Sequence, residues 1–417
     1  MTSEPPTGRL APGGFDLARD VAGGLPLTLV ERWLATGRGA ADARRLLSGH
    51  TVRGYGVVSD TSGLTKVSGR LGLLEVLALI DRPKRVLHRH GAAAGGRAVG
   101  VWAADNAQMF HPASTDPRVL LSALLRARDE IERHCRVRVG VGVHLGDFYD
   151  LAGGLYGPDA DLIEDLAENH VEGGEIAVTQ AVVDRLPDGH GFVLRRGREA
   201  DGLGAVHLLL DGPRPPAERP PEAGTYPIPY SSAFYADLLR LDGRPDDAGL
   251  AARLAARHLR RRTVVLVERD AVPAATPELA LLNGLALSSV MSRTGLRLIP
   301  RPGAMEVKVS GPLAIYLFDD PAPAVRFAER MRAGLADHGI SCRIGVDTGP
   351  VLAGETPSGG WDVAGAPVNV ASKMAQDLGT PGRIYLSEAM GEHVPSGKAY
   401  TPVRHTVSGV SMTCYEG

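Results

Sequence analysis

Residues 56–60 read Gly-Val-Val-Ser-Asp, and residues 263–268 read Thr-Val-Val-Leu-Val-Glu. Each run is a short apolar stretch that ends in a carboxylate, which is typical of a buried strand whose last side chain projects beyond the sheet. The elements that follow the two runs come in the same order along the chain. The chain therefore contains an internal repeat, and this repeat decides the fold class.

A long helical stretch follows each apolar run. The first covers residues 71 to about 90, with a kink expected at Pro83 and a helix stop at Gly91. The second covers about residues 277–293, and Gly295 is its expected stop. Both copies of the repeat therefore begin with a strand and then a helix.

Each copy continues with a hairpin, an amphipathic helix, a buried strand, a short helix and a last strand. The hairpins are predicted at residues 97–110 and 305–318, the buried strands at 139–146 and 344–349, and the last strands at 174–178 and 382–386. The order β-α-β-β-α-β is the ferredoxin-like arrangement. We therefore expect an α+β protein made of two ferredoxin-like domains.

The chain length fits this organisation, because 417 residues suffice for two or three domains that each bury a core. We expect a helical and polar lead-in at 1–50, a first domain at 51–212, a Pro-rich linker with a helix at 213–260, and a second domain at 261–417. Related domains can pack around a pseudo-two-fold axis. The expected arrangement is an intramolecular pseudo-dimer in a monomeric chain.

Composition excludes several classes of protein. Hydrophobic residues make up 44% and charged residues 23% of the chain, as in ordinary globular proteins. The net charge of −2 argues against a general nucleic-acid binder. No apolar run reaches the roughly 18 residues that span a bilayer, and residues 1–14 lack the pattern of a signal peptide. Three cysteines show no metal-binding spacing, so reduced thiols and a cytoplasmic location are expected.

Asp60 opens the sequence Asp60-Thr61-Ser62-Gly63-Leu64-Thr65 at the end of the first apolar strand. The turn formed by Thr61, Ser62, Gly63 and Leu64 offers backbone N–H groups to an anion such as a phosphate. Taken alone, Asp60 is better explained as a helix N-cap or a turn residue.

Asp105 lies in the first hairpin, which is a neighbour of the first strand in a ferredoxin-like sheet. The two carboxylates can therefore approach one another, and two carboxylates beside a triphosphate suit Mg²⁺. Alone, Asp105 would be assigned to a hairpin turn; together with Asp60, metal binding is the better interpretation. If Phe110 is matched to Phe318, however, Ala104 rather than Asp105 takes this position.

The second copy lacks both acids and carries other polar residues instead. Glu268 stands near the place of Asp60, and Pro312 near that of Asp105, with Lys308 four residues before it. Asp362 then precedes a helix in which Asn369 and Lys373, four residues apart, share one face. Each of four residues could singly be a capping residue or a solvated side chain: Lys308, Asp362, Asn369 and Lys373. Together, in this order, they indicate a site.

These motifs resemble the class III nucleotidyl cyclase family over about residues 51–210 and 261–417. Asp60 to Thr65 resembles the family's D-I-x-G-F-T metal motif, and Lys308 to Pro312 resembles K-x-x-G-D without its metal aspartate. Asp362 to Met374 resembles D-V-x-G-x-x-V-N-x-A-x-R, with Lys373 in the place of the arginine. The pair of copies is similar to the two halves of mammalian adenylyl cyclases.

The resemblance implies an adenylyl cyclase that converts ATP to 3′,5′-cyclic AMP and pyrophosphate at one composite site. Asp60 and Asp105 would hold two Mg²⁺ (or Mn²⁺) ions, and Lys308 and Asp362 would bind the base. Asn369 would orient the ribose and Lys373 would contact the α-phosphate. The first copy has Val101 in place of the base lysine, and about Gly154 and Asp161 in place of the base aspartate and the asparagine.

Departures from the family pattern support an alternative. Lys373 lacks the planar fork of arginine, and residues 407–410 contain no lysine to contact the triphosphate. The chain could be a cyclase-like pseudoenzyme that binds an adenine nucleotide and signals through its conformation or a partner. A third possibility is an enzyme that acts on another adenine nucleotide.

Overall fold

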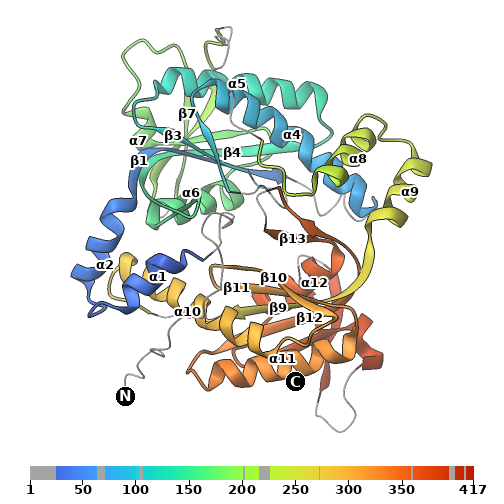
Figure 1. The fold of residues 1–417 in the computed structure, drawn as a ribbon. Coiled ribbons are helices and arrows are strands. Elements are labelled where there is room, and N and C mark those ends of the chain that lie inside the picture. The colour runs from blue at the N-terminus through green and yellow to red at the C-terminus, as the bar shows by residue number, and fades with distance from the viewer. Residues whose placement is uncertain are drawn as a thin grey trace. The chain divides into compact units, whose positions relative to one another are not determined.

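The computed structural model describes residues 25–62, 71–100, 102, 107–200, 202–215, 226–271, 273–357, 360–393, 400–407 and 410–417. The chain forms two compact units, each built around one copy of the repeat (Figure 1). One unit contains residues 47–255, and the other contains residues 256–417 together with the N-terminal 46 residues. Among the described helices, none is both long and apolar enough to cross a membrane.

The first copy is a mixed sheet with strand order β2-β3-β1-β4-β6-β8-β7, and β5 pairs with β4. Its elements are β1 (Thr51–Ser62), α4 (Leu73–Ala93), β2 (Arg97–Val99), β3 (Ala107–Pro112), α5 (Pro117–His134), β4 (Arg138–Leu151), β5 (Gly154–Tyr156), α6 (Pro158–Asn169), β6 (Ile176–Thr179), α7 (Gln180–Val183), β7 (Val193–Ala200) and β8 (Gly204–Asp211).

The second copy repeats this topology with the order β10-β11-β9-β12-β14-β16-β15, and β13 pairs with β12. Its elements are β9 (Arg260–Arg269), α10 (Pro277–Leu298), β10 (Ala304–Ser310), β11 (Leu313–Phe318), α11 (Pro321–Ala336), β12 (Cys342–Glu355), β13 (Trp361–Ala364), α12 (Ala366–Gln376), β14 (Ile384–Ser387), the 3₁₀ turn Glu388–His393, β15 (Thr401–Val407) and β16 (Val410–Glu416).

The predicted ferredoxin-like order is confirmed in both copies, because β4-β1-β3-β2 and β12-β9-β11-β10 are neighbouring antiparallel strands. Each sheet is longer than predicted. The added strands are a C-terminal hairpin, β7–β8 or β15–β16, and the short strands β5 and β13. The short strand β13 carries Asp362, one of the predicted site residues.

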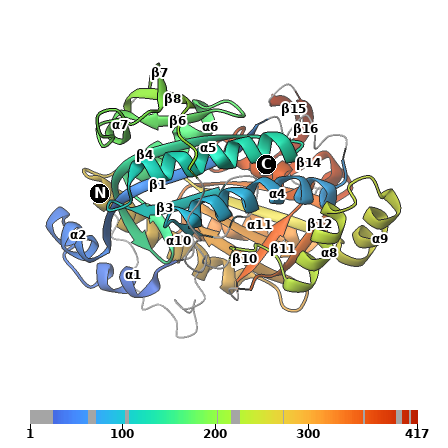
Figure 2. The same cartoon turned by 90° about the horizontal axis from the view of Figure 1, so that it is seen from above.

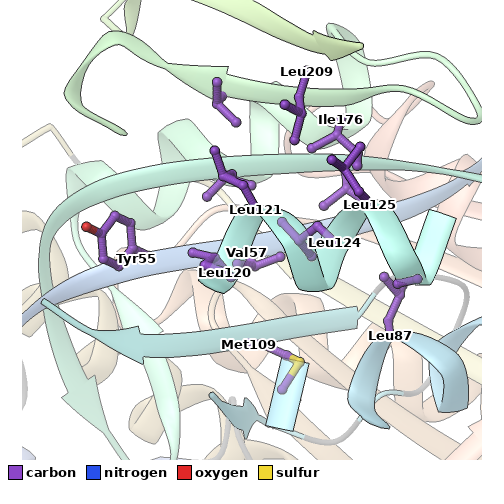
Figure 3. Packing of buried hydrophobic residues seen from close by; sticks show 14 of the residues in the cluster. Tyr55, Val57, Leu87, Met109, Leu120, Leu121, Leu124, Leu125, Ile176 and Leu209 are labelled. Carbon is purple, nitrogen blue, oxygen red and sulfur yellow. The ribbon is translucent and has the colours of Figure 1, made fainter. Parts of the chain in front are cut away.

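Helices cover both faces of the first sheet. On one face, Leu120, Leu121, Leu124 and Leu125 of α5 pack against strand residues such as Val57 and Met109 (Figure 3). Helix α4 contributes Val86 and Leu87 to the same cluster and lies beside α5 (Figure 2). On the opposite face, Ile163 and Leu166 of α6 pack against Phe148. The sheet therefore forms the middle layer of a three-layer domain.

Strand registers align the two copies residue by residue. Ser59 pairs with Ala107 and with Val141, and Val141 pairs with Ile176. In the second copy Val267 pairs with Ala314 and with Ile344, and Ile344 pairs with Ile384. Because the sheets have the same strand order, these two sets of four residues correspond, and Asp60 corresponds to Glu268.

Gly91 and Gly295 were wrongly predicted as helix stops, since α4 and α10 continue to Ala93 and Leu298. The glycines serve close packing instead. A Cβ on Gly91 would lie 2.4 Å from Met109 Sδ, and one on Gly295 would lie 2.1 Å from Tyr316 Oη. Pro83 likewise lies inside α4. A glycine in the sequence can indicate either a helix end or a close helix–sheet contact, and only the structure distinguishes the two.

The helices that precede each copy in the sequence belong mostly to the compact unit of the other copy. Helix α1 (Leu27–Leu34) packs beside α10, and the indole Nε1 of the buried Trp33 donates to Asn283 Oδ1 at 3.2 Å. Helix α2 (Ala40–Leu47) and the turn Ser48–His50 then lead into β1. Helices α8 (Ser232–Asp242) and α9 (Ala248–His258) lie mostly in the unit of the first copy, since that unit ends at Ala255.

Candidate functional site

Lys308 and Asp362 meet in the second copy. Lys308 Nζ lies 2.6 Å from Asp362 Oδ1, and the lysine side chain is 40% exposed while the aspartate side chain is 11% exposed. The two residues are more than fifty positions apart in the sequence and come from β10 and β13. The fold therefore brings together the two residues that were predicted to read a base.

A β-bulge directs Lys308 toward Asp362. The register of β10 shifts between Glu306, which pairs with Tyr316, and Lys308, which pairs with Ile315. Paired residues point to the same side of a sheet, so Glu306 faces α10 and Lys308 faces the side covered by α12. Without the extra residue, Lys308 would pair with Ala314 and point to the wrong face.

Asp362 is held in place by its own strand. It pairs with Gly354 of β12, and its Oδ1 also accepts the backbone N–H of Val363 at 2.9 Å. Both contacts use the same oxygen, so Oδ2 is left to accept a further hydrogen bond. The pair thus offers a donor, the Lys308 ammonium, beside an acceptor, Asp362 Oδ2.

Helix α12 carries Asn369 and Lys373 one turn apart, with Asn369 exposed and Lys373 half-buried. The helix lies so close to the sheet that a Cβ on Gly345 would be 2.0 Å from the Ala371 carbonyl oxygen. Its N-cap, Gly365, has a φ of 149°, and a Cβ there would approach Pro350 O to 2.9 Å. Glycines at these positions thus fix the place of the Asn369–Lys373 face.

Asp60 lies near the end of β1, paired with Gly140 of β4. Thr61 is buried and Ser62 is half-buried, and both belong to the same strand rather than to a turn, which corrects the prediction of a turn at these residues. Gly63, Leu64 and Asp105 lie outside the described residues. A Cβ on Gly140 would lie 3.1 Å from Val171 Cγ1 and from Glu172 O, so a glycine stands opposite Asp60 where residues 171 and 172 come close to β4.

The corresponding place in the second copy holds an arginine. Arg343 pairs with Glu268 across β9 and β12; its Nη2 lies 3.3 Å from Glu268 Oε2, and its Nε lies 3.4 Å from Asp270 Oδ1. Burial raises the pKa of Glu268, and the charge of Arg343 opposes this rise. A guanidinium thus lies beside the strand-end carboxylate of the second copy.

The first copy carries other residues at the places of these polar side chains. Gly154 pairs with Leu151 as Asp362 pairs with Gly354, and Asp161 and Asp165 of α6 stand at the places of Asn369 and Lys373. Val101 lies outside the described residues. The strand register instead puts Val99 at the place of Lys308. Val99 pairs with Gln108, and Gln108 corresponds to Ile315, the partner of Lys308.

Two features of the site escaped prediction from sequence. The bulge at Lys308 depends on pairing with another strand. In the sequence, Arg343 has the pattern of an ordinary strand residue, and only the strand register places it opposite Glu268. Within the described ranges, no three His, Cys, Asp or Glu side chains cluster as metal ligands.

The second copy also carries a sequence match. Residues 299–408 match the family model of the adenylate and guanylate cyclase catalytic domain. This part of the second copy is therefore similar to class III nucleotidyl cyclase catalytic domains. The match spans the Lys308–Asp362 pair and α12. Because the family includes cyclases for both bases, the base must be inferred from the site itself.

Solved structures resemble one or both copies. A class III adenylyl cyclase-like ATP-binding protein from Pseudomonas aeruginosa is 13% identical, covers 83% of this chain and 85% of its own, and has a TM-score of 0.50. The adenylyl cyclase CyaB from P. aeruginosa is 16% identical over 39% of this chain and 97% of its own, with a TM-score of 0.34.

The guanylate cyclase domain of RhGC from Catenaria anguillulae, solved with GTP, is 20% identical over 37% of this chain and 94% of its own, with a TM-score of 0.30. No match was found among curated proteins. The adenylyl cyclase-like ATP-binding protein from P. aeruginosa covers 83% of this chain, which is more than either copy alone contains. The likeness in fold therefore extends over both copies.

Proposed function

We propose that the chain is an adenylyl cyclase that converts ATP to 3′,5′-cyclic AMP and pyrophosphate at one composite site. The first copy would supply the metal-binding carboxylates, Asp60 and Asp105. The second would supply Lys308 and Asp362 for the base and α12 for the ribose and phosphate. This requires the copies to pack as a pseudo-two-fold pair, which is part of the proposal.

The observation that carries the proposal is that the two copies are complementary at corresponding positions. Asp60 faces a glycine where Glu268 faces Arg343, and Asp362 stands where the first copy has Gly154. Neither copy alone retains both functions. Random loss of residues would not divide the functions so cleanly between the copies.

Asp60 fits a role in binding Mg²⁺ or Mn²⁺. Its carboxylate is at a strand end and partly exposed, and the residue paired with it on β4 is Gly140. The register of β3 supports Asp105 as its companion, because Ala107 corresponds to Ala314 and so Pro312 corresponds by counting to Asp105, not to Ala104. When bound, two such ions lower the pKa of the ribose 3′-hydroxyl and neutralise the triphosphate.

The base-reading pair favours adenine. Lys308 has three ammonium protons, so it can keep its contact with Asp362 and still donate to adenine N1. Asp362 Oδ2 can accept from the N6 amino group. Guanine presents an N1–H donor and an O6 acceptor, so Lys308 would face a donor, and a buried mismatch of this kind discriminates strongly.

Asn369 and Lys373 are assigned to the ribose and the α-phosphate. Both lie on the face of α12 that the sheet contact at Gly345 leaves uncovered. The Asn369 amide can orient the ribose, and the Lys373 ammonium can stabilise charge on the α-phosphate as the 3′-oxygen attacks in line and pyrophosphate leaves.

The test is to incubate the purified chain with ATP or GTP and with Mg²⁺ or Mn²⁺, and to measure cyclic nucleotide and pyrophosphate. We expect cyclic AMP and pyrophosphate in equal amounts. Cyclic GMP as the main product would contradict the base assignment, and binding of ATP with no product would contradict the enzyme.

A nucleotide-binding pseudoenzyme is the second candidate, and Lys373 is the observation that favours it. A lysine gives one point contact where an arginine gives two parallel hydrogen bonds. The same assay separates the two candidates, and Lys373→Arg sharpens it. Under the enzyme proposal this variant forms product at least as fast as the original chain.

A further inference from the structure

The indole of Trp102 joins the two strands of the β2–β3 hairpin. Its Nε1–H lies 3.1 Å from Val99 O, at the end of β2, and 3.0 Å from Gln108 O, at the start of β3. The side chain is 2% exposed. One donor shared between two carbonyls fixes the ends of both strands relative to each other, and β3 pairs with β1 as far as Ser59, the residue before Asp60.

A buried lysine holds the same residue from the helix side. Lys84 of α4 is 2% exposed, and its Nζ donates to the Trp102 carbonyl at 2.7 Å. Placing an ammonium group in a core costs several kcal/mol unless it is compensated. Asp81, one turn earlier and also buried, supplies a nearby negative charge. The buried Lys84 ammonium is therefore stabilised by the Trp102 carbonyl and by the charge of Asp81.

The second copy uses the same two helix positions for the same purpose. Gly91 and Gly295 correspond, since each makes room for corresponding β3 and β11 side chains, and this alignment matches Lys84 with Ser288 and His88 with Ser292. Ser288 Oγ donates to Gly311 O in the β10–β11 turn, and Ser292 Oγ lies 2.9 Å from Glu306 Oε1 in β10. In both copies, the long helix therefore holds the hairpin.

In the first copy, the contact between Lys84 and Trp102, called the latch below, also reaches the segment between the copies. Tyr226 lies edge-on to Trp102, with ring centroids 5.7 Å apart, and edge-on to His88 at 5.5 Å. Its hydroxyl donates to Asp81 Oδ1 at 2.9 Å. The linker is therefore in direct contact with Trp102 and with Asp81, the acid one turn before Lys84.

Helix α8 strengthens this connection. Tyr235 Oη lies 3.3 Å from Asp81 Oδ2, and Arg85 bridges Asp81, at 2.8 Å, and Asp242. Arg82 lies 3.0 Å from the same Asp242 carboxylate. The start and the end of α8 are thus both tied to one turn of α4, the turn that carries Lys84.

We propose that Lys84, Trp102 and Tyr226 are positioning residues that set the place of the β2–β3 hairpin beside Asp60, and that the inter-copy segment controls metal affinity through them. This rests on the proposed metal site of the first copy. It adds a route by which a partner or ligand that moves residues 226–242 would change activity, without touching the site.

The experiment uses the full chain labelled with 5-fluorotryptophan, whose three indoles give separate ¹⁹F resonances. Trp102→Phe identifies the Trp102 resonance. Lys84→Met and Tyr226→Leu should shift or broaden it and leave those of Trp33 and Trp361 unchanged. Mn²⁺ affinity, measured from the EPR signal of free Mn²⁺, should fall about tenfold in both variants.

Two further variants separate positioning from general damage. Lys84→Gln retains an N–H donor and should recover part of the Mn²⁺ affinity lost in Lys84→Met. Leu239→Ala removes an exposed side chain of α8 and should change neither readout. If Lys84→Met does not fold, Tyr226→Leu alone decides.

A Trp102 resonance that is unmoved in Tyr226→Leu overturns the inference, and so does Mn²⁺ affinity equal to that of the original chain. A different pattern marks failure of the proposed function. In that case the original chain itself binds no Mn²⁺, and the inference falls with the metal site.

Discussion

Arg343 faces Glu268 across β9 and β12 at 3.3 Å, at the place where the first copy pairs Asp60 with a glycine. An arginine and a divalent cation are alternative partners of a strand-end carboxylate. Each places positive charge beside the carboxylate, and the two cannot occupy the same space. Under the proposed function, the exchange of Gly140 for Arg343 distinguishes the copy that binds the metal from the copy that does not.

Asp60→Asn should lower cyclase activity by at least about 100-fold, since an amide cannot replace a carboxylate as a metal ligand and loss of the ion removes several kcal/mol of stabilisation. Its matched control is Glu268→Gln, at the corresponding position. That variant should keep activity within about threefold. Comparable losses in both variants would contradict the assignment of the metal to the first copy. Asp105→Asn should behave like Asp60→Asn.

Base preference should change when donor and acceptor are exchanged. Lys308→Glu combined with Asp362→Ser presents an acceptor to N1–H and a small hydroxyl near O6, so the ratio of kcat/KM for ATP to that for GTP should fall by about 100-fold or more. Asn369→Ala is the control, because it should lower activity with both nucleotides alike. An unchanged ratio in the double variant would show that another residue reads the base.

Neither copy should act alone. A fragment of about residues 1–215 carries Asp60 without base-reading residues, and one of about residues 222–417 carries the reverse, so each should be inactive even as a homodimer. Mixing should restore part of the activity, helped by α1, which packs beside α10. The intact chain should remain faster, because the linker raises the effective concentration. Product from either fragment alone would overturn the composite site.

Glu306 should make the second unit less stable as the pH rises. Burial raises its pKa to about 7 from an ordinary 4.5, and hydrogen bonds from Ser292 and Tyr316 oppose this rise only in part. The unfolded chain loses this proton first, so the unfolding free energy should fall between about pH 4.5 and 7 and stay low above.

Glu306→Gln removes this loss. Relative to the original chain, it should gain on the order of 2 kcal/mol in unfolding free energy at pH 8 compared with pH 4.5, as measured by denaturant unfolding. The exposed Glu392→Gln is the control and should show no such gain. A gain that does not depend on pH would indicate a packing effect instead.

Gly295→Ala should destabilise the second unit by about 1–3 kcal/mol, because its Cβ would lie 2.1 Å from Tyr316 Oη and force the helix away from the sheet. Gly39→Ala, where the added Cβ meets nothing within 4 Å, should shift the unfolding midpoint little. Had Gly295 been a helix stop in the left-handed region, the cost would come from backbone strain; here it comes from overlap, so Gly295→Ser should cost more than Gly295→Ala.

The sequence by itself determined the repeat, the ferredoxin-like order and the position of the polar motifs. These follow from local patterns: an apolar run that ends in Asp60 or Glu268, and residues four apart on one helix face, as for Asn369 and Lys373. Such patterns depend on neighbours within a few positions along the chain, so the folded structure keeps them.

Tertiary structure decided what depends on partners far along the chain. The bulge that turns Lys308 toward Asp362, the arginine opposite Glu268 and the glycines beneath Met109 and Tyr316 all arise between elements that the sequence does not show side by side. The latch of Lys84 on Trp102 is of the same kind, because a lysine in a helical pattern indicates a solvated face until the packing around it shows that it is buried.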